Sequence, residues 1–561
     1  MPWHIRGVRV GCGKSLVTEL PIAGDPGSVV SMTTPSKSLI AGLVILAAGA
    51  FTRLQAESYD LLIRGARVLD GTGTPWYYAD IGVRAGRIVD VGRLPVDAVA
   101  KRAVDATGLY LAPGFIDPHS HAGPALAGSA LAGAVPLLTQ GVTTVFINPD
   151  GGGPVDLVWQ RGLIEAQRPA VNVALLIGHN SVRTDVIGLA DRAPTTAELA
   201  RMEGLVRRAM EQGAFGLSAG PFYTPGNFSK TDEHIALARV VSAHDGIYSS
   251  HIRDEGDYTV GLVAAVDEVI TIAREARLPG IVTHIKALGP RVWGLSAEVV
   301  RRIDQARTEG VEVFADQYPY EASSTSLSAA LLPAWAMEGG TASLRKRLAD
   351  PETLPLIRKA MLDNLERRAG ANAIQLRSHR ADPSVEGLRL DHVARNRGLE
   401  PVDAAIALIA AGGAQIVSFN MQEEDIRRFM VQPWTMTCSD GDMVAIGDGV
   451  PHPRSYGPFP RKIRRYVVEE KVLTLERAVH SMTGLPATVL RVTDRGFIRV
   501  GAWADLVLFD LAALTDRATY EAPHQLSEGM RHVFVNGHEA LAAGRVTDQR
   551  AGLVLSRSPK S

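Results

Sequence analysis

Residues 111–123 read LAPGFIDPHSHAG, an apolar run that ends in two histidines separated by one residue. Side chains at alternate positions of an extended strand point to the same side, so His119 and His121 can contact one metal ion. A His-x-His pair alone is weak evidence for a metal site, because such pairs also occur by chance. The interpretation of this pair therefore depends on the rest of the chain.

Three later segments also run from apolar residues into a side chain with metal-binding or acid–base chemistry. They are GIYSSHIRDEG at 246–256, which contains His251, GIVTHIKALG at 280–289, which contains His284, and WTMTCSDGD at 434–442, which contains Asp440. Parallel strands that alternate with helices bring such residues together at the carboxyl-terminal mouth of a barrel. Each histidine taken singly could be an ordinary buried residue, whereas four histidines and an acid at strand ends indicate one shared site.

The composition is that of an ordinary globular protein. The chain has 561 residues, 46% of them apolar, and a net charge of -1, which is enough for two or three domains. No basic excess suggests a nucleic-acid partner. Cysteine occurs only at positions 12 and 438, which excludes a disulfide framework and a cysteine-rich zinc site.

The first 56 residues predict a leader. A lysine precedes the apolar run at 38–51, which is short for a bilayer span and is followed by the small-residue site LQA. This layout predicts a signal peptide at 32–56, preceded by upstream sequence at 1–31, and the alternative is an uncleaved membrane anchor. We therefore expect a secreted or periplasmic protein without stable membrane association after cleavage, in which Cys438 is the one remaining thiol.

The two ends of the mature chain share one pattern. Residues 57–111 alternate short β-rich runs with glycine-containing turns, and similar runs return within 491–561. Two such halves can join in one sheet, so we predict a composite β-sandwich domain made of both segments. The region at 112–490 would then be a catalytic domain inserted between them.

Eight strand-like apolar runs alternate with helical segments in this central region. The runs are LAPGFIDPHSH, TTVFINPD, VNVALLIGH, AFGLSAGPF, GIYSSHI, GIVTHIK, VEVFADQYPY and WTMTCSD, with helices such as those expected at 196–213 and 296–310. Repeated strand–helix units with continuous apolar strands predict a parallel sheet, and eight units predict a closed (β/α)8 TIM-like barrel. Extra material at about 331–432 predicts an insertion between the last two strands.

Motifs along most of the chain carry a family resemblance. They are PGFIDPHSH, QGVTTV, GLSAGPFYTPG, SHIRDEG, THIKALG, YPYEASST, CSDG, PHPRSYGPFPR, MTGLPA and RGFIRVGAWADLVLFD. In number and order they resemble those of the N-acyl-D-amino-acid deacylases (D-aminoacylases) of the metal-dependent amidohydrolase superfamily. The resemblance covers about residues 59–555. It implies a hydrolase that cleaves the amide bond of N-acyl-D-amino acids, or similar N-acylated carboxylates, with one or two zinc ions.

The resemblance also implies roles for the clustered residues. His119 and His121 would hold the more exposed metal, and His251 and His284 the more tightly bound one, since neutral imidazoles suit zinc. Asp440 would accept a proton from the attacking water and pass it to the leaving nitrogen. An amide needs this transfer, because nitrogen leaves only after protonation.

Recognition of the substrate carboxylate would fall, by the same resemblance, to Lys286 and Arg454. A guanidinium pairs bidentately with a carboxylate, which orients the chiral carbon. Tyr223 and Ser323 would make supporting contacts, although both could equally be packing residues. His179, at the end of its strand-like run, is a further candidate for contact with substrate.

One position departs from the family pattern. The family usually has a metal-bridging cysteine just after the QGVTTV strand, and this chain has Asp150 at that place. A carboxylate can bridge two ions but is a harder ligand than a thiolate, so either the second metal binds weakly or one ion suffices. Asp150 could also be a turn residue before three glycines. The loop at 441–450 is longer than usual, which leaves the side-chain preference open.

Two other functions compete with deacylation. A dipeptidase or cyclic-amide hydrolase would keep the chemistry and change the bond; Lys286 and Arg454 favour an α-carboxylate but do not exclude dipeptides. A non-catalytic binding protein on the same barrel is the third alternative, and it would be expected to lose the acid or a histidine. We expect a small-molecule partner and no nucleic acid, and the oligomeric state is open.

Overall fold

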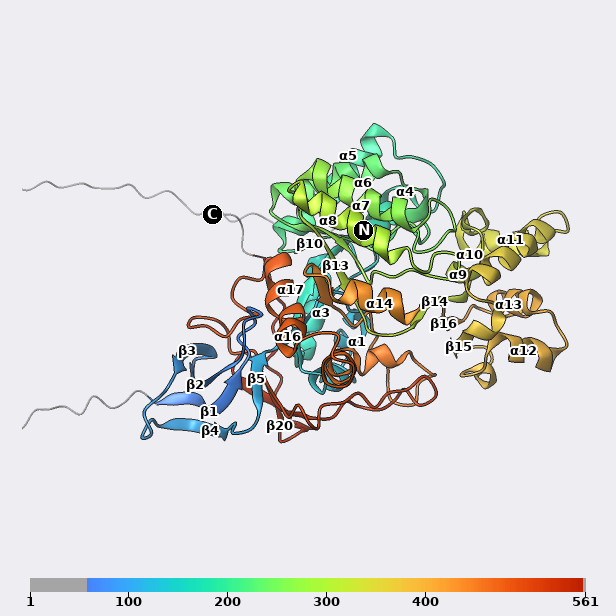
Figure 1. Ribbon diagram of the computed structural model, residues 1–561. Coiled ribbons are helices and arrows are strands. Elements are labelled where there is room, and N and C mark those ends of the chain that lie inside the picture. The colour runs from blue at the N-terminus through green and yellow to red at the C-terminus, as the bar shows by residue number, and fades with distance from the viewer. Residues whose placement is uncertain (1–57, 558–561) are drawn as a thin grey trace, which may run out of the picture. The chain divides into compact units, whose positions relative to one another are not determined.

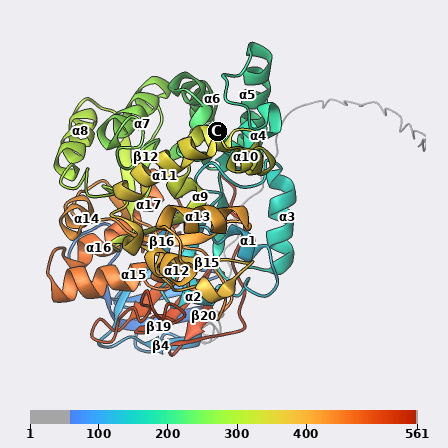
Figure 2. The ribbon, with the colours of Figure 1, turned by 90° about the vertical axis from the view of Figure 1, so that its right-hand side faces the viewer.

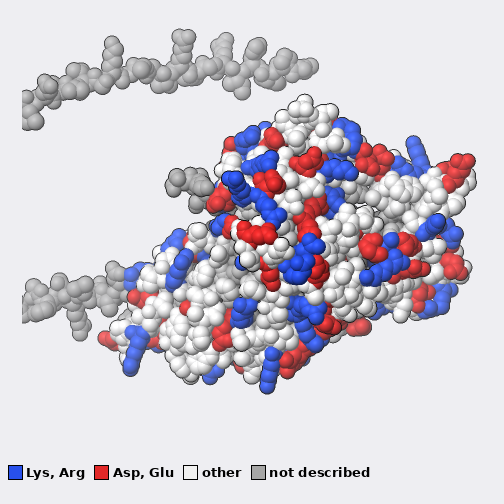
Figure 3. All heavy atoms as spheres, turned by 45° about the horizontal axis from the view of Figure 1, so that its top comes forward, with Lys and Arg blue, Asp and Glu red and all other residues white. Residues whose placement is uncertain are grey.

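The computed structural model describes residues 58–557. The expected leader at 1–56, with its signal peptide and Cys12, lies outside these residues. Among the described helices, none has the length and apolar character needed to cross a membrane. On the face that Figure 3 presents, basic and acidic side chains are interspersed over the surface.

A ring of parallel strands forms the centre of the molecule. Three strands pair in the order β6–β7–β8 and six in the order β9–β10–β11–β12–β13–β17. The strands are β6 (Phe115–Asp117), β7 (Val142–Ile147), β8 (Asn172–Leu175), β9 (Ile177–Gly178), β10 (Gly216–Ala219), β11 (Ile247–Ser250), β12 (Gly280–Val282), β13 (Val313–Gln317) and β17 (Thr435–Thr437). Only Leu176 separates β8 from β9, so these two pieces occupy one strand position.

Backbone hydrogen bonds join the last strand to the first. The amide of Asp440 donates to the carbonyl of His119 over 2.9 Å, and the amide of His121 donates to the carbonyl of Gly441 over 3.0 Å. Because the strands carry apolar side chains on both faces, as in the fully buried VTTVFI of β7, each strand needs cover inside and outside the ring. The (β/α)8 barrel expected from the eight apolar runs is confirmed.

Amphipathic helices surround the barrel. They are α3 (Leu157–Gln167), α4 (His179–Ile187), α5 (Thr196–Glu211), α6 (Thr231–Ala243), α7 (Leu262–Ala276), α8 (Ser296–Thr308), α14 (Glu423–Met430), α16 (Leu475–Met482) and α17 (Gly484–Val489). Short turns are α1 (Gly123–Leu126), α2 (Val135–Leu138), η1 (Gly226–Phe228), η5 (Pro453–Ser455) and α15 (Pro458–Arg461), and η6 (Lys462–Glu469) is a π-helix of eight residues. Helix α5 begins with a capping box, in which Thr195 and Glu198 each satisfy the other's backbone amide. Figure 1 shows α5 to α8 grouped along one side of the barrel strands.

Strands from both ends of the chain share one sheet. Its order is β21–β20–β19–β18–β5–β1–β2–β3, with β4 beside β1. The strands are β1 (Tyr59–Val68), β2 (Tyr77–Arg84), β3 (Arg87–Gly92), β4 (Ala100–Asp105), β5 (Tyr110–Pro113), β18 (Leu506–Phe509), β19 (Met530–Val535), β20 (His538–Ala542) and β21 (Arg545–Val546). The antiparallel pair β5–β18 joins the two ends. The domain boundaries at 57–111 and 491–561 stay a prediction, since 57–561 form one compact unit.

A helical segment with its own small sheet lies between β13 and β17. It contains β14 (Ala322–Ser326), α9 (Leu327–Leu331), η2 (Ala334–Met337), α10 (Gly340–Ala349), α11 (Leu354–Arg367), η3 (Ala371–Ala373), β15 (Ile374–Ser378), η4 (Pro383–Val385), α12 (Leu390–Arg397), α13 (Pro401–Ala410) and β16 (Gln415–Phe419). Its helices pack in a separate apolar cluster, and Figure 2 shows α12 and α13 beside β15 and β16. Because β14 pairs with β16, the extra material starts before the expected residue 331.

Candidate active site and metal centre

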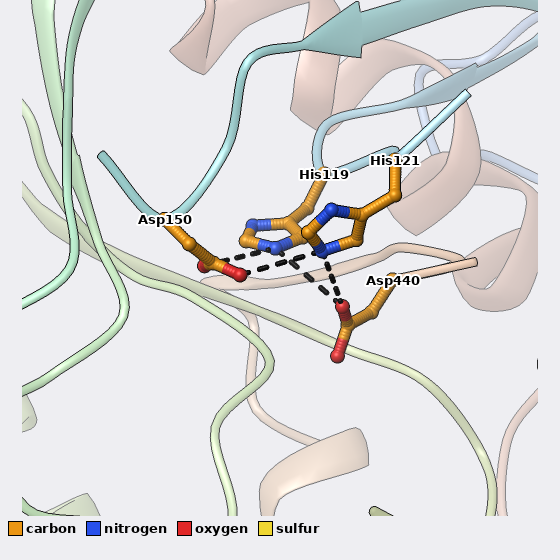
Figure 4. Close-up of side chains that lie close together, drawn as sticks. All are labelled: His119, His121, Asp150 and Asp440. Atoms are coloured by element: carbon orange, nitrogen blue, oxygen red, sulfur yellow. Dashed lines mark ion pairs between the residues drawn. The ribbon is translucent and has the colours of Figure 1, made fainter. Parts of the chain in front are cut away.

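Two histidines and two aspartates meet at the carboxyl-terminal mouth of the barrel (Figure 4). His119 and His121 follow β6, Asp150 follows β7 and Asp440 follows β17. The Nε2 atoms of His119 and His121 each lie 3.3 Å from a carboxylate oxygen of Asp150. Oδ1 of Asp440 lies 3.6 Å from His119 Nε2 and 3.2 Å from His121 Nε2. These four side chains surround a point where one cation fits.

A second group shares one of these aspartates. His251 follows β11 and His284 follows β12, and their facing ring nitrogens are 3.0 Å apart. Oδ1 of Asp150 lies 3.8 Å from His251 Nδ1 and 3.4 Å from His284 Nε2. Asp150 therefore stands between the two groups, in the position that a bridging carboxylate would occupy.

The unsatisfied atoms of the site fit bound metal. Both ring nitrogens of His119 are buried without a hydrogen-bond partner among the described residues, and its Nε2 is the one that faces Asp150 and Asp440. Buried polar atoms are rarely left unpaired unless an ion or water completes them. Imidazole nitrogens with carboxylate oxygens are a donor set that zinc accepts. The structure thus brings together all six residues expected at the centre: His119, His121, Asp150, His251, His284 and Asp440.

Three residues of the site have unusual backbone conformations, which set the direction of their side chains. Asp150, His284 and Asp440 have positive φ angles of 56°, 36° and 47°. This left-handed region is unfavourable for residues other than glycine, and such strain concentrates at functional sites. Neighbouring acids hold the strained segments. Asp316 accepts the amide of His284 over 2.6 Å, and Asp117 accepts the amide of Ser439 over 2.9 Å.

Charges in the site favour an ionised Asp440. Burial alone would raise the pKa of this carboxyl group, but the adjacent Arg454 guanidinium and the imidazoles lower it well below its ordinary value. Arg454 Nη1 lies 2.7 Å from Asp440 Oδ2. Burial likewise opposes the charged form of His121, yet Asp150 and Asp440 raise its pKa to about 10. Such an excess of negative charge around an imidazole is typical of a site built for a cation.

Glu255 was not anticipated from the sequence. Its Oε1 lies 3.0 Å from His284 Nδ1 and 2.5 Å from Lys286 Nζ, and its Oε2 lies 4.0 Å from His251 Nε2. It thus contacts each histidine at the ring nitrogen opposite the one that faces Asp150. A carboxylate in this position orients metal-binding imidazoles. The available signal was its place four residues after His251 in SHIRDEG.

The two groups open into a cavity of about 660 Å³. Four of the five residues expected to contact substrate line it: Lys286, Arg454, Tyr223 and Ser323. Tyr318, which sequence reasoning missed, also lines it. The Arg454 guanidinium and the Lys286 ammonium lie 4.7 and 5.5 Å from the centre of the Tyr318 ring. The two cations and this tyrosine therefore form one wall.

His179 takes a different place. It is fully buried at the start of α4, and it is not among the residues that line the cavity. Its Nδ1 lies 3.1 Å from Asn180 Oδ1, and its Nε2 lies 2.8 Å from Glu233 Oε1. Because both ring nitrogens have protein partners, this geometry does not support the expected contact with substrate.

Part of the cavity lining, here called the apolar wall, consists of apolar side chains. Its residues come from α1, α3 and the glycine-rich segment after Asp150, and they are Pro124, Ala127, Pro154, Trp159 and Leu163. Trp159 is 56% exposed although it is a large apolar side chain. The cavity lining thus includes both a charged wall and an apolar wall.

Known proteins are similar to this chain in sequence and fold. A family model described as "Amidohydrolase family" matches residues 102–540. The N-acyl-D-glutamate deacylase of Alcaligenes xylosoxydans xylosoxydans is 37% identical over 523 residues, which cover 89% of this chain and 97% of the relative. The D-aminoacylase of the same organism is 34% identical over 526 residues, which cover 90% of this chain and 99% of the relative.

A solved structure extends the comparison. N-acyl-D-glutamate deacylase from Bordetella bronchiseptica, complexed with zinc and a phosphonate that mimics the tetrahedral intermediate, has a TM-score of 0.75 and 34% identity. The match covers 89% of this chain and 100% of that one. The resemblance inferred from the motifs is confirmed, and the chain belongs to the amidohydrolase family, among the N-acyl-D-amino-acid deacylases.

Proposed function

We propose that this protein hydrolyses N-acyl-D-amino acids to a carboxylic acid and a free D-amino acid. The observation that carries the proposal is the joint placement of three parts in one cavity. These parts are the histidine–aspartate cluster, the buried acid Asp440, and the wall of Lys286, Arg454 and Tyr318. Amide hydrolysis needs an electrophile, an acid–base group and a hold on the substrate, and these three parts provide them.

The side chains divide the chemical work. His119, His121, His251, His284 and Asp150 would hold the metal. A bound zinc ion polarises the scissile carbonyl and favours ionisation of the attacking water. Asp440 accepts the proton of that water, because its lowered pKa keeps it ionised at neutral pH. It then delivers the proton to the amide nitrogen, which leaves as an amine.

The charged wall orients the substrate. Arg454 and Lys286 are each paired with an acid of the site, and an incoming α-carboxylate competes for both cations. The phenol of Tyr318 is buried without a hydrogen-bond partner among the described residues, so it is free to donate to the same carboxylate. Tyr223 and Ser323 line the adjoining surface. With the α-carboxylate on this wall, the acyl group extends toward the apolar wall around Trp159.

Paired enantiomers test the proposal. Amine release is measured from N-acetyl-D- and N-acetyl-L-amino acids after metal removal and after zinc is added back. Zinc-dependent release from the D-enantiomer alone is expected. Zinc-dependent cleavage of dipeptides or cyclic amides, with neither N-acetyl enantiomer cleaved, would contradict the assigned substrate and leave the barrel chemistry intact.

Export is part of the proposal and rests on the sequence of residues 32–56. Cell fractionation and amino-terminal sequencing of the expressed full chain provide the test. A periplasmic or secreted product that begins at Glu57 is expected, and a variant without residues 32–56 should stay in the cytoplasm. A product that keeps its apolar run and sediments with membranes would instead show an uncleaved anchor.

A further inference from the structure

One arginine in the cavity wall has no acidic partner. Arg368 immediately follows α11 in the inserted segment, lines the cavity and is only 1% exposed. Its Nε has no hydrogen-bond partner among the described residues. Its guanidinium carbon lies 5.7 Å from the centre of the Tyr258 ring, and its Nη1 lies 3.3 Å from the oxygen of Asn420 in the satisfied orientation of that amide. All of these neighbours are neutral.

The other cations of the cavity differ in this respect. Each pairs with a carboxylate that also lines the cavity: Lys286 with Glu255, Arg377 with Asp442, and Arg454 with Asp440. Among the described lysines and arginines that line the cavity, Arg368 is the one without such a pair. Three of the four cationic side chains that line the cavity are therefore neutralised by carboxylates of the protein. The positive charge of Arg368 is not neutralised in this way.

An unbalanced buried arginine favours an anionic ligand. Removing a guanidinium from water is unfavourable unless an anion compensates it, and arginine cannot escape the cost by losing its proton. Its planar group binds carboxylates through two parallel hydrogen bonds. A carboxylate that enters the cavity therefore gains more from Arg368 than from a cation that already has a partner.

The position of Arg368 assigns that carboxylate to the amino-acid side chain of the substrate. The α-carboxylate goes to Lys286, Arg454 and Tyr318, and the acyl group extends toward the apolar wall. Arg368 and Ser323 both line the cavity and both contact Asn420, and Arg368 belongs to the inserted segment, outside the barrel strands that carry the metal-binding residues. We propose that Arg368 binds a second carboxylate, so that the preferred substrates are N-acyl derivatives of acidic D-amino acids.

This inference rests on the proposed deacylase function and narrows it. Sequence similarity does not decide which amino-acid side chain is preferred, because the D-glutamate deacylase and the D-aminoacylase are similarly identical to this chain, at 37% and 34%. The preference for an acidic side chain is inferred instead from the buried guanidinium of Arg368.

An isosteric pair of substrates isolates that charge. N-acetyl-D-glutamate and N-acetyl-D-glutamine have the same shape and differ by one negative charge, so the ratio of their kcat/KM values reports the contribution of the side-chain carboxylate. We expect the unmodified protein to prefer glutamate by at least about 100-fold, as for a buried charge pair. In the Arg368→Met variant the ratio should fall to within about threefold of one, mainly through a higher KM for glutamate.

The adjacent arginine provides a matched control. Arg367 is half-buried, pairs with Asp257 over 3.2 Å and with Asp363, and does not line the cavity. The Arg367→Met variant should therefore keep the glutamate-to-glutamine ratio of the unmodified protein. Thermal unfolding of both variants shows whether either has lost its fold, and the ratio in the unmodified protein tests the proposal even if Arg368→Met does not fold.

The outcomes separate the two levels of the proposal. Equal or better cleavage of N-acetyl-D-glutamine by the unmodified protein would overturn the inference and leave the deacylase function intact. A glutamate preference that survives Arg368→Met in a folded variant would overturn the assignment to this residue. Cleavage of no N-acyl-D-amino acid at all would overturn the proposed function itself.

Discussion

Replacing Lys462 with methionine should stabilise the protein at neutral pH. Lys462 lies on η6, is 2% exposed, and has no acidic partner among the described residues. Its ammonium donates to Thr437 Oγ1 over 2.8 Å and to Ser481 Oγ over 2.9 Å. Burial lowers its pKa from 10.5 to about 7. Methionine has a similar volume and carries no charge, so Lys462→Met removes the unfavourable ionisation without opening a cavity.

The magnitude follows from the pKa. A fall from 10.5 to about 7 corresponds to a cost of about 5 kcal/mol when the buried group is protonated. The two hydrogen bonds offset roughly half of this, at about 1–1.5 kcal/mol each. The hydroxyls of Thr437 and Ser481 lie 3.0 Å apart and retain each other as partners. The net gain is therefore about 2 kcal/mol, or roughly 2 °C in Tm for a chain of this size.

The pH dependence gives the sharper test. Between about pH 7 and 10.5 the unfolded chain holds a proton on Lys462 that the native protein has lost, so the stability of the unmodified protein rises with pH in this window. Below about pH 7 both states are protonated and the full cost applies. The advantage of Lys462→Met should thus be largest at pH 6–7 and disappear near pH 8.5, where the remaining ionisation cost equals the contribution of the two lost hydrogen bonds. At pH 10 the variant should be less stable than the unmodified protein.

Thermal unfolding followed by circular dichroism at pH 6, 7, 8.5 and 10 measures this effect. The control is Lys346→Met, at an exposed position of α10, which should shift Tm by less than about 0.5 °C at each pH. An advantage of Lys462→Met that is absent at pH 7, or equal at pH 7 and pH 10, would refute the reasoning. It would mean that the buried amine is neutral throughout or has an unseen counter-ion.

Three further predictions concern the site. Asp440→Asn should lower kcat by about 100- to 10,000-fold in a steady-state assay with zinc present, because the acid–base group is lost, and activity above one-tenth of normal would exclude that role. Glu255→Gln should weaken zinc binding by about 10- to 100-fold in competition with a chromogenic chelator, because both tightly held histidines lose their orienting carboxylate; unchanged affinity would assign Glu255 to Lys286 alone. Asp150→Ala should lower the zinc content measured by mass spectrometry, and a full complement of zinc would show that it does not bridge.

Much of the site could be predicted from the sequence, because an apolar run that ends in a polar residue marks the end of a barrel strand. The apolar runs before His119, His251 and His284 each end in a polar residue, and the barrel topology alone brings such ends together. Asp150 came from the family resemblance, because it stands where the family usually has a metal-bridging cysteine. The three histidines owe their positions to backbone connectivity, which periodicity in the sequence reveals.

The remaining contacts depend on side-chain packing, which leaves no periodic signal. Tyr223 and Tyr318 both follow barrel strands, and only the structure shows that Lys286 and Arg454 flank the second one. His179 also follows a strand, but its Nε2 is hydrogen-bonded to Glu233 of α6 and is not available to substrate. The unpaired state of Arg368 is likewise visible only when every nearby charge has been placed.

The closure of the barrel has a consequence for synthesis of the chain on the ribosome. The backbone hydrogen bonds from Asp440 to His119 and from His121 to Gly441 join the last barrel strand to the first. The first metal-binding histidines therefore cannot contact the catalytic acid until 440 of the 561 residues have been made, and such distant pairings form slowly. No nascent fragment that ends before β17 can assemble the complete centre. A chain that is still being synthesised and has not reached β17 should therefore have no hydrolase activity.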